Sequence, residues 1–182
     1  MSRQLDDANL EPKAIATIRE VSTISILSAR DWNAQPREAM ISITGTGEPR
    51  ARLKRGWSHV LRLTFDDIEE PRLGGKLFSE EDADRVISFL DRIEGKVDHV
   101  IAHCRLGLSR APAIVKFISE RYDLGDGFRN ARTFNRHVYE TLTLNGKGGR
   151  ICSAKEESSD CSARREAGSR CSRSTTISGG RF

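Results

Sequence analysis

The sequence predicts an α/β fold in a single domain. Four short segments are apolar and rich in β-branched residues, as buried strands are. Three longer segments repeat apolar residues at helical spacing. With 182 residues, of which 37% are hydrophobic, the chain is long enough for one well-buried domain but not for a second core of similar size.

The predicted strands cover residues 23–28, 40–44, 59–65 and 97–103. The first alternates polar and apolar residues, and the second ends at a turn over residues 45–49 that contains two glycines and a proline. The third places Leu61, Leu63 and Phe65 on one face. The fourth is apolar along most of its length, which indicates a buried strand.

Three helices are predicted after the third strand. The first has Ser79 as its N-cap, acidic residues in its first turn, and Gly95 as its stop. The second covers residues 111–122 and is apolar around most of its circumference, so we expect it to be central and buried. The last is predicted over residues 128–142. Its inward-facing residues would be Phe128, Ala131, Phe134, Val138 and Leu142.

The two ends of the chain differ from its body. Residues 1–20 are polar and mixed, and we expect an N-terminal arm there, with the folded domain over residues 21–145. Residues 146–182 are rich in Ser, Gly and Arg and contain too few apolar residues to offset the entropy of ordering, so a disordered tail is predicted.

Charge and cysteine distribution narrow the classes of function. Eight of the 30 Lys and Arg and four of the 26 Asp and Glu lie in residues 146–182, so residues 1–145 carry 22 of each. A neutral body removes the main electrostatic argument for a nucleic-acid partner. Only Cys104 lies in the body, and the tail spacing of Cys152, Cys161 and Cys171 matches neither a disulfide framework nor a zinc site.

We therefore expect a reducing, cytoplasmic setting without a bound metal. The N-terminus lacks the apolar core of a secretory signal, and no stretch approaches the ~20 apolar residues of a membrane span.

The run from His103 to Arg110 contains the residues that point to a function. It places a cysteine and an arginine six positions apart, around Gly107, between a predicted strand and a predicted helix. Backbone N–H groups of such a loop, with the unpaired N–H groups of the first helical turn, form a concave nest that favours an anion. The same nest favours a thiolate over a thiol. The spacing therefore predicts a phosphate site built around a reactive cysteine.

This run has the HCxxGxSR form of the protein tyrosine phosphatase loop, and its surroundings resemble those of dual-specificity phosphatases over about residues 21–143. Within that group the chain looks like a small bacterial branch of predicted tyrosine phosphatases. In the low-molecular-weight phosphatases the loop lies near the N-terminus, whereas here it follows most of the predicted strands. The resemblance implies a single central, mostly parallel sheet of four to five strands flanked by helices. It also implies hydrolysis of a phosphomonoester through a phosphocysteine intermediate, with no cofactor.

Each residue of the motif has an expected role. Cys104, as thiolate, would attack phosphorus, and Arg110 would bind two phosphoryl oxygens through its planar guanidinium. The phosphate-binding set is the loop itself: Arg105, Leu106, Gly107, Leu108, Ser109 and Arg110. His103 and its neighbour Cys104 point to opposite faces of a strand, so His103 is expected to support the loop rather than act as a base.

The family takes the proton for the leaving group from an Asp after an earlier strand. Alignment of residues 59–65 with the family pattern indicates Asp67, with Asp66 as the alternate.

One residue departs from the family pattern. A Ser or Thr usually follows the loop arginine and stabilises the departing thiolate, whereas this chain has Ala111. The loss of such a donor predicts slow breakdown of the phosphocysteine.

Three alternatives for the function remain open: a phosphatase of phosphotyrosine or a related phosphomonoester, a phosphatase of lipid or inositol phosphates, and a catalytically impaired phosphate-binding module. The expected partner is a phosphorylated protein or a small phosphomonoester. The sequence does not indicate an oligomeric state.

Overall fold

A computed structural model describes residues 18–125, 127–128 and 133–148 of the chain. All of these residues belong to one of the two compact units of the chain, Met1–Cys152. The other unit, Ser153–Phe182, lies outside the described residues.

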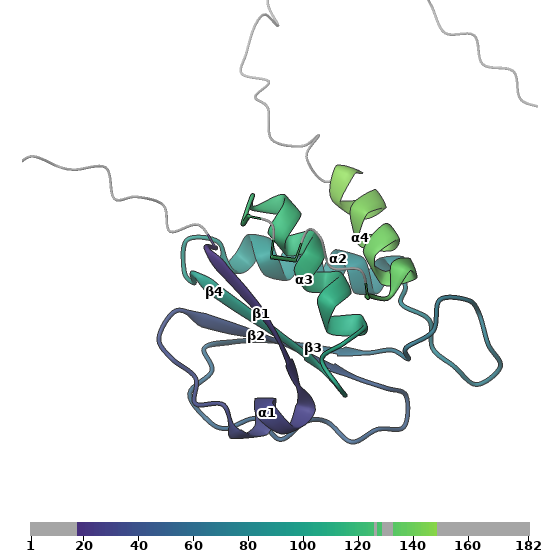
Figure 1. Ribbon diagram of the computed structural model, residues 1–182, viewed down its shortest axis with the longest axis horizontal. Helices are drawn as coiled ribbons and strands as arrows, with labels where there is room; N and C mark the ends of the chain where they lie inside the picture. Colours follow the sequence, from purple (N-terminus) through teal and green to yellow (C-terminus); the bar gives the residue numbers. More distant parts are fainter. Residues whose placement is uncertain (1–17, 126, 129–132, 149–182) are drawn as a thin grey trace, which may run out of the picture. The chain divides into compact units, whose positions relative to one another are not determined.

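The core of the fold is a four-stranded sheet in which all neighbouring strands are parallel. Its strands are β1 (Glu20–Ser25), β2 (Glu38–Thr44), β3 (His59–Thr64) and β4 (His99–Cys104). They are arranged in the order β1-β4-β2-β3, so β4 and β2 form the buried centre (Figure 1). The predicted α/β fold with a central parallel sheet flanked by helices is therefore confirmed.

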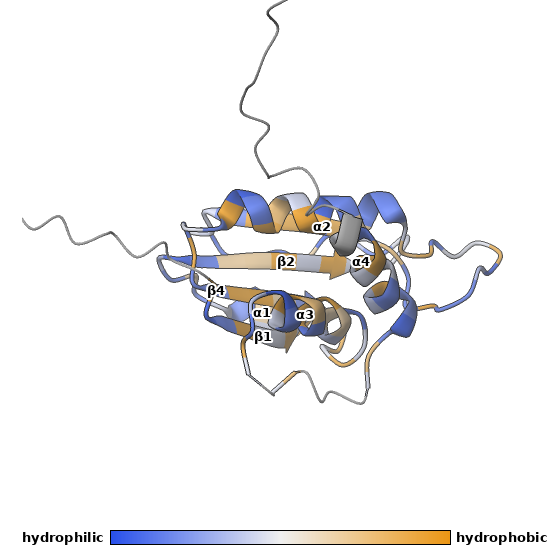
Figure 2. Ribbon diagram, turned by 90° about the horizontal axis from the view of Figure 1, so that it is seen from above, coloured by the Kyte–Doolittle hydropathy of each residue, from blue (hydrophilic) through white to orange (hydrophobic). Residues whose placement is uncertain are grey.

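Helices cover both faces of the sheet, and strand residues alternate between the two cores. Helices α2 (Glu80–Ile93), α3 (Arg110–Arg121) and α4 (Arg136–Gly148) lie on one side, and the short α1 (Ile26–Asp31) lies on the other (Figure 1). Ile41 of β2 packs in the large core with the three helices, while Met40 packs with Ala29 of α1. Figure 2 shows the apolar side of α2 turned toward β2.

The first strand differs from its predicted range of 23–28. It begins at Glu20 and ends at Ser25, because its residues pair in parallel register with β4 from His99 to Cys104. Ser25 then starts α1 by accepting a hydrogen bond from the backbone N–H of Ser28 at 3.1 Å. A serine inside an alternating segment thus acts as an N-cap, which is why the strand ends early.

The last helix was also predicted wrongly. Residues 127–128 form a turn, residues 133–135 are not helical, and α4 begins only at Arg136. The cause is Asn135, whose Oδ1 accepts a hydrogen bond from the backbone N–H of Val138 at 3.1 Å and so caps the helix. Val138 and Leu142 are buried as expected. Ala131 lies outside the described residues.

The predicted boundaries of the domain, residues 21 and 145, lie within β1 and α4. Ile18 is buried and β1 begins at Glu20, whereas the rest of the predicted N-terminal arm, residues 1–17, lies outside the described residues. Helix α4 continues to Gly148, and the predicted tail from residue 149 onward also lies outside them.

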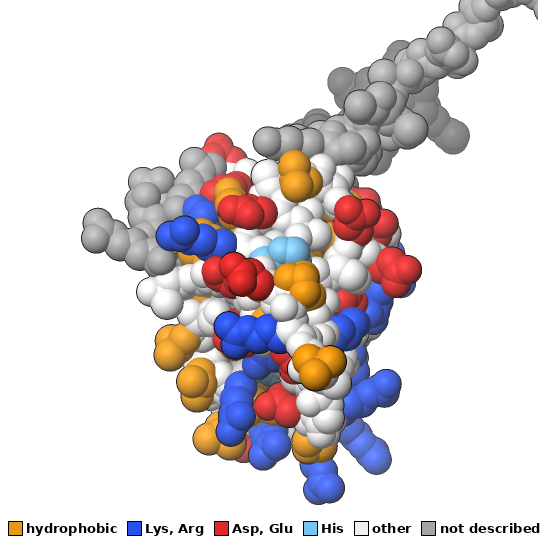
Figure 3. Space-filling view, turned by 90° about the vertical axis from the view of Figure 1, so that its right-hand side faces the viewer, with side chains coloured by type: hydrophobic (Ala, Val, Ile, Leu, Met, Phe, Trp, Pro, Cys, Tyr) orange, Lys and Arg blue, Asp and Glu red, His pale blue; other side chains and the backbone are white. Residues whose placement is uncertain are grey.

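Charged side chains are unevenly distributed over one face of the described structure. In the face shown in Figure 3, acidic side chains lie mainly in the upper half and basic ones mainly in the lower half. None of the helices in the described part of the chain is both long and apolar enough to cross a membrane.

Candidate active site

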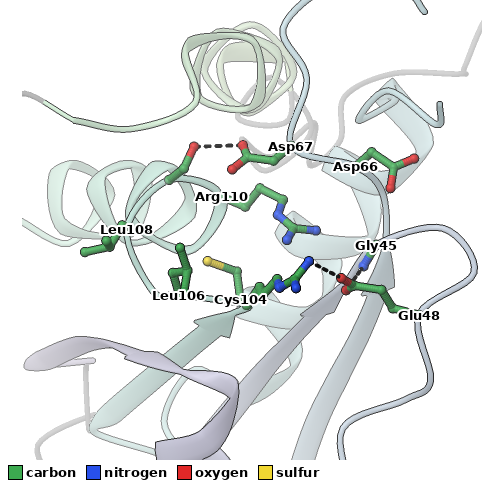
Figure 4. Close-up of a pocket in the computed structure, with 10 residues that line it drawn as sticks. Gly45, Glu48, Asp66, Asp67, Cys104, Leu106, Leu108 and Arg110 are labelled. Atoms are coloured by element: carbon green, nitrogen blue, oxygen red, sulfur yellow. Dashed lines mark hydrogen bonds and ion pairs between the residues drawn. The ribbon is translucent and has the colours of Figure 1, made fainter.

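A pocket of about 280 Å³ lies where β2, β3 and β4 end. Three loops form it, because the carboxyl ends of parallel strands meet at one edge of a sheet. Its lining comprises Gly45 and Glu48 after β2, Asp66 and Asp67 after β3, and Cys104, Arg105, Leu106, Leu108, Ser109 and Arg110 after β4 (Figure 4). The fold thus brings Cys104, Arg110, Asp66 and Asp67 together.

Cys104 is the last residue of β4, and its side chain is almost completely buried at the base of the pocket. Its Sγ accepts a hydrogen bond from the backbone N–H of Gly107 at 3.2 Å. The loop therefore curls so that at least one of its amides points at the sulfur.

Gly107 makes that curl possible. Its φ is +77°, in the left-handed region that favours glycine. A Cβ at this position would lie 2.8 Å from both the carbonyl carbon and the carbonyl oxygen of Ile24 in β1. Both backbone conformation and space therefore require glycine here.

Arg110 begins α3 and is only 5% exposed. Its Nη1 donates to the carbonyl oxygen of Phe65 at 2.9 Å, which fixes the plane of the guanidinium. Its Nε is buried and has no hydrogen-bond partner among the described residues. A buried donor without a partner lowers the stability of the fold by about 1–3 kcal/mol. An anionic acceptor in the pocket would bond to this donor and remove that loss of stability.

The two adjacent aspartates lie in different surroundings. Asp66 accepts hydrogen bonds from the backbone N–H groups of Lys76 and Thr46, both at 2.8 Å. These two bonds lower the pKa of the Asp66 carboxyl below its ordinary value, and the charge of Arg110 lowers it further. Asp66 is therefore held as a carboxylate and is a poor proton donor.

Asp67 instead faces the loop of residues 103–110, which we call the phosphate loop after the site predicted there. Its Oδ1 accepts hydrogen bonds from Ser109 Oγ at 2.7 Å and from Asn135 Nδ2 at 3.0 Å. The bond to Ser109, drawn as the dashed line at Asp67 in Figure 4, bridges the loop after β3 and the loop after β4. Both donors converge on Oδ1, and Asp67 lines the pocket together with Cys104 and Arg110.

His103 lies behind the loop. It is fully buried, and its Nε2 lies 2.8 Å from Ser42 Oγ in β2. Burial lowers the pKa of the His103 imidazole to about 4, so the ring is neutral at pH 7. Its side-chain hydrogen bond ties β4 to β2 one residue before Cys104, which is the position of a supporting residue.

Two residues that contact the pocket lining or form part of it were missed by sequence reasoning. Asn135 is 2% exposed and donates through Nδ2 to Asp67 and to the carbonyl oxygen of Ile68, and its backbone N–H donates to the carbonyl oxygen of Ser109. It thus joins α4 to the loops after β3 and β4. The available signal was an Asn with N-cap character inside a segment otherwise read as continuous helix.

Glu48 is the second missed residue. Its Oε2 accepts from the backbone N–H of Gly45 at 2.7 Å, and its Oε1 lies 3.7 Å from Arg105 Nη1 (Figure 4). The Arg105 side chain is 73% exposed and directed at Glu48, so it belongs to the rim of the pocket. The signal was the position of Glu48 in a turn directly after a parallel strand.

The position after the loop arginine has no hydroxyl to offer. Ala111 is fully buried in the core. Ser109 does carry a hydroxyl, but this donates to Asp67 Oδ1. In the described residues, the thiolate donor that the family pattern places after Arg110 is therefore absent.

Comparison with known proteins assigns no family: no family model and no curated protein matches the chain. No group of three or more His, Cys, Asp or Glu side chains in the described ranges is arranged to hold a metal ion.

Proposed function

We propose that the chain is a cysteine-dependent phosphatase that hydrolyses phosphotyrosine or a related phosphomonoester. The observation that carries the proposal is the convergence of Cys104, Arg110 and Asp67 on one pocket at the carboxyl end of the sheet. Nucleophile, anion-binding cation and carboxyl acid are the three groups that phosphoryl transfer through cysteine needs.

In the first step, Cys104 Sγ attacks phosphorus and forms an S–P bond while the P–O bond to the leaving group breaks. Asp67 transfers its proton to the departing oxygen, which makes the leaving group an alcohol or phenol. Arg110 Nε, which is buried and has no hydrogen-bond partner in the described part of the chain, donates to a phosphoryl oxygen throughout. The product of this step is phosphocysteine.

In the second step, water attacks phosphorus, Asp67 takes a proton from the water, and the S–P bond breaks. Negative charge returns to sulfur, where the Gly107 N–H is a donor to Sγ. The hydroxyl that would normally follow Arg110 is replaced by the Ala111 methyl group. The second step is therefore the slow one.

Hydrolysis of 4-nitrophenyl phosphate by the full chain tests the proposal. We expect the Cys104→Ser variant to be inactive and the Cys152→Ser variant, which changes a cysteine outside the described residues, to retain full activity. Added chelator should have no effect. Equal activity of the Cys104→Ser variant and the unmodified chain, or dependence on added metal, would contradict the cysteine mechanism.

The second candidate is a phosphate-binding module that does not turn over, and Ala111 is the observation that favours it. A rapid release of about one equivalent of 4-nitrophenol, followed by slow turnover, supports the phosphatase. Binding of phosphate without any release supports the module. A thiolate nucleophile requires a reduced thiol, so either function is consistent with the proposed cytoplasmic setting.

A further inference from the structure

A second cluster of reactive side chains lies at the start of the strands, away from the phosphate loop. It joins Ser22 of β1, His99 of β4 and Glu38 of β2. Ser22 Oγ lies 2.9 Å from His99 Nε2, and His99 Nδ1 lies 3.2 Å from Glu38 Oε1. A hydroxyl, an imidazole and a carboxylate are thus connected in line through the two nitrogens of one ring.

The contacts of Glu38 determine which nitrogen of His99 carries the proton. Glu38 Oε2 accepts hydrogen bonds from Trp32 Nε1 at 3.0 Å and from the backbone N–H of Gln35 at 2.9 Å. These partners can only donate, so Oε2 of Glu38 accepts from both. In the tautomer that suits a carboxylate at Glu38, His99 Nδ1–H donates to Oε1. In the neutral ring, Nε2 then has a free lone pair and accepts from the Ser22 hydroxyl.

This is the tautomer that a general base needs, and the base is held in place from several sides. Glu38 is only 8% exposed and is tied to Trp32 and Gln35 as well as to His99. The Trp32 and His99 rings are in edge contact, with centroids 6.5 Å apart. Ser22 by contrast is partly exposed, on the edge strand of the sheet. Ser22 and His99 are thus partly exposed and Glu38 is buried, as a nucleophile, base and orienting acid require.

The Glu20 carboxylate, on the same edge strand, is a second carboxylate near the ring. Its Oε1 lies 3.9 Å from His99 Nε2, and its side chain is 68% exposed. Glu20 can stabilise the imidazolium that forms when His99 takes the proton of Ser22.

We propose that Ser22, His99 and Glu38 form a second catalytic site, which hydrolyses aryl esters of carboxylic acids. In its first step, Ser22 Oγ bonds to the acyl carbon and gives its proton to His99 Nε2. The bond to the aryloxide then breaks, and the aryloxide takes that proton from His99. Water attacks the acyl-serine with the same proton transfers and releases the carboxylic acid, so atoms and charge balance without another reactant.

The direct test is covalent labelling of Ser22 by a fluorophosphonate in the full-length Cys104→Ser chain, which removes the thiol of the phosphate loop. We expect an adduct on the tryptic peptide of residues 20–30, with fragment ions placing it at Ser22 rather than Ser25 or Ser28. A His99→Gln variant should lose the adduct. No adduct at Ser22, or equal labelling in the His99→Gln variant, would overturn the proposal.

Hydrolysis of 4-nitrophenyl acetate gives a second readout. In the same background, the Ser22→Ala variant should be slower by at least about tenfold, since a positioned base contributes about 10²–10⁴-fold. Ser88→Ala, which changes an exposed serine of α2, is the matched control and should leave the rate unchanged. Equal rates in the Ser22→Ala and Ser88→Ala variants would overturn the proposal. With Cys104 restored, Ser22→Ala should keep full activity toward 4-nitrophenyl phosphate, which shows that the variant is folded.

Discussion

Replacement of Gly107 by alanine tests how the phosphate loop is packed against the sheet. We expect the substitution to lower the free energy of unfolding in two ways. A φ of +77° disfavours any residue with a Cβ by about 1–2 kcal/mol. The new Cβ would also lie 2.8 Å from backbone atoms of Ile24, which cannot rotate away, and overpacking of this kind costs about 1–3 kcal/mol more.

Gly74 separates these two costs. Its φ is +75°, and a Cβ there would meet nothing within 4 Å. Urea unfolding of Gly107→Ala and Gly74→Ala should therefore show that both lose stability, with the loss at Gly107 larger by about 1–3 kcal/mol. Activity toward 4-nitrophenyl phosphate should fall only in Gly107→Ala, because relief of the clash moves the amide that points at Cys104 Sγ. Equal losses of stability in the two variants, with activity retained in both, would refute this account of the loop.

Three further predictions concern the chemistry and the pH dependence of stability. Ala111→Ser supplies the hydroxyl that the family pattern has after the loop arginine. It should raise the steady-state rate by about 10²-fold and remove the initial burst of 4-nitrophenol. An unchanged burst would show that another step limits turnover. Asn135→Ala should resemble Asp67→Asn: the loss of hydrolysis rate should be small for aryl phosphates whose phenolate leaves readily and should grow as the leaving group becomes more basic. An equal loss of rate across a substrate series would show that Asn135 acts only on folding or binding. His103 has a lowered pKa of about 4 in the fold, so below pH 6.5 the unfolded chain binds a proton that the folded chain does not bind. The free energy of unfolding should therefore fall between pH 6.5 and 4, by up to about 1.4 kcal/mol per pH unit more than in the His103→Gln variant. Parallel pH profiles of the two proteins would contradict this assignment.

Where the sequence prediction failed, a polar side chain began a helix that apolar periodicity did not reveal. The segment 23–28 alternates like a strand, but Ser25 caps α1 and the strand lies three residues earlier, in register with β4. The segment 128–142 repeats apolar residues like a helix, but Asn135 caps α4 in its middle. Periodicity reports which residues are buried, and it does not report where the backbone finds a better hydrogen-bond partner.

The sequence by itself determined the α/β class, the buried helix after the loop, and the meeting of a cysteine and an arginine at one loop. These features depend on residues that are neighbours in the chain, so spacing and local propensity are enough to predict them. The absence of a hydroxyl after Arg110 was visible in the same way.

Only the tertiary structure decided which of two adjacent carboxyls is held as an anion and which faces the phosphate loop. Asp66 is held by amides of Thr46 and Lys76, and Asp67 by side chains of Ser109 and Asn135. These partners lie 10 to 68 residues away in the sequence. A pattern within the chain cannot show them, because a parallel sheet brings together at one edge loops that are distant in sequence.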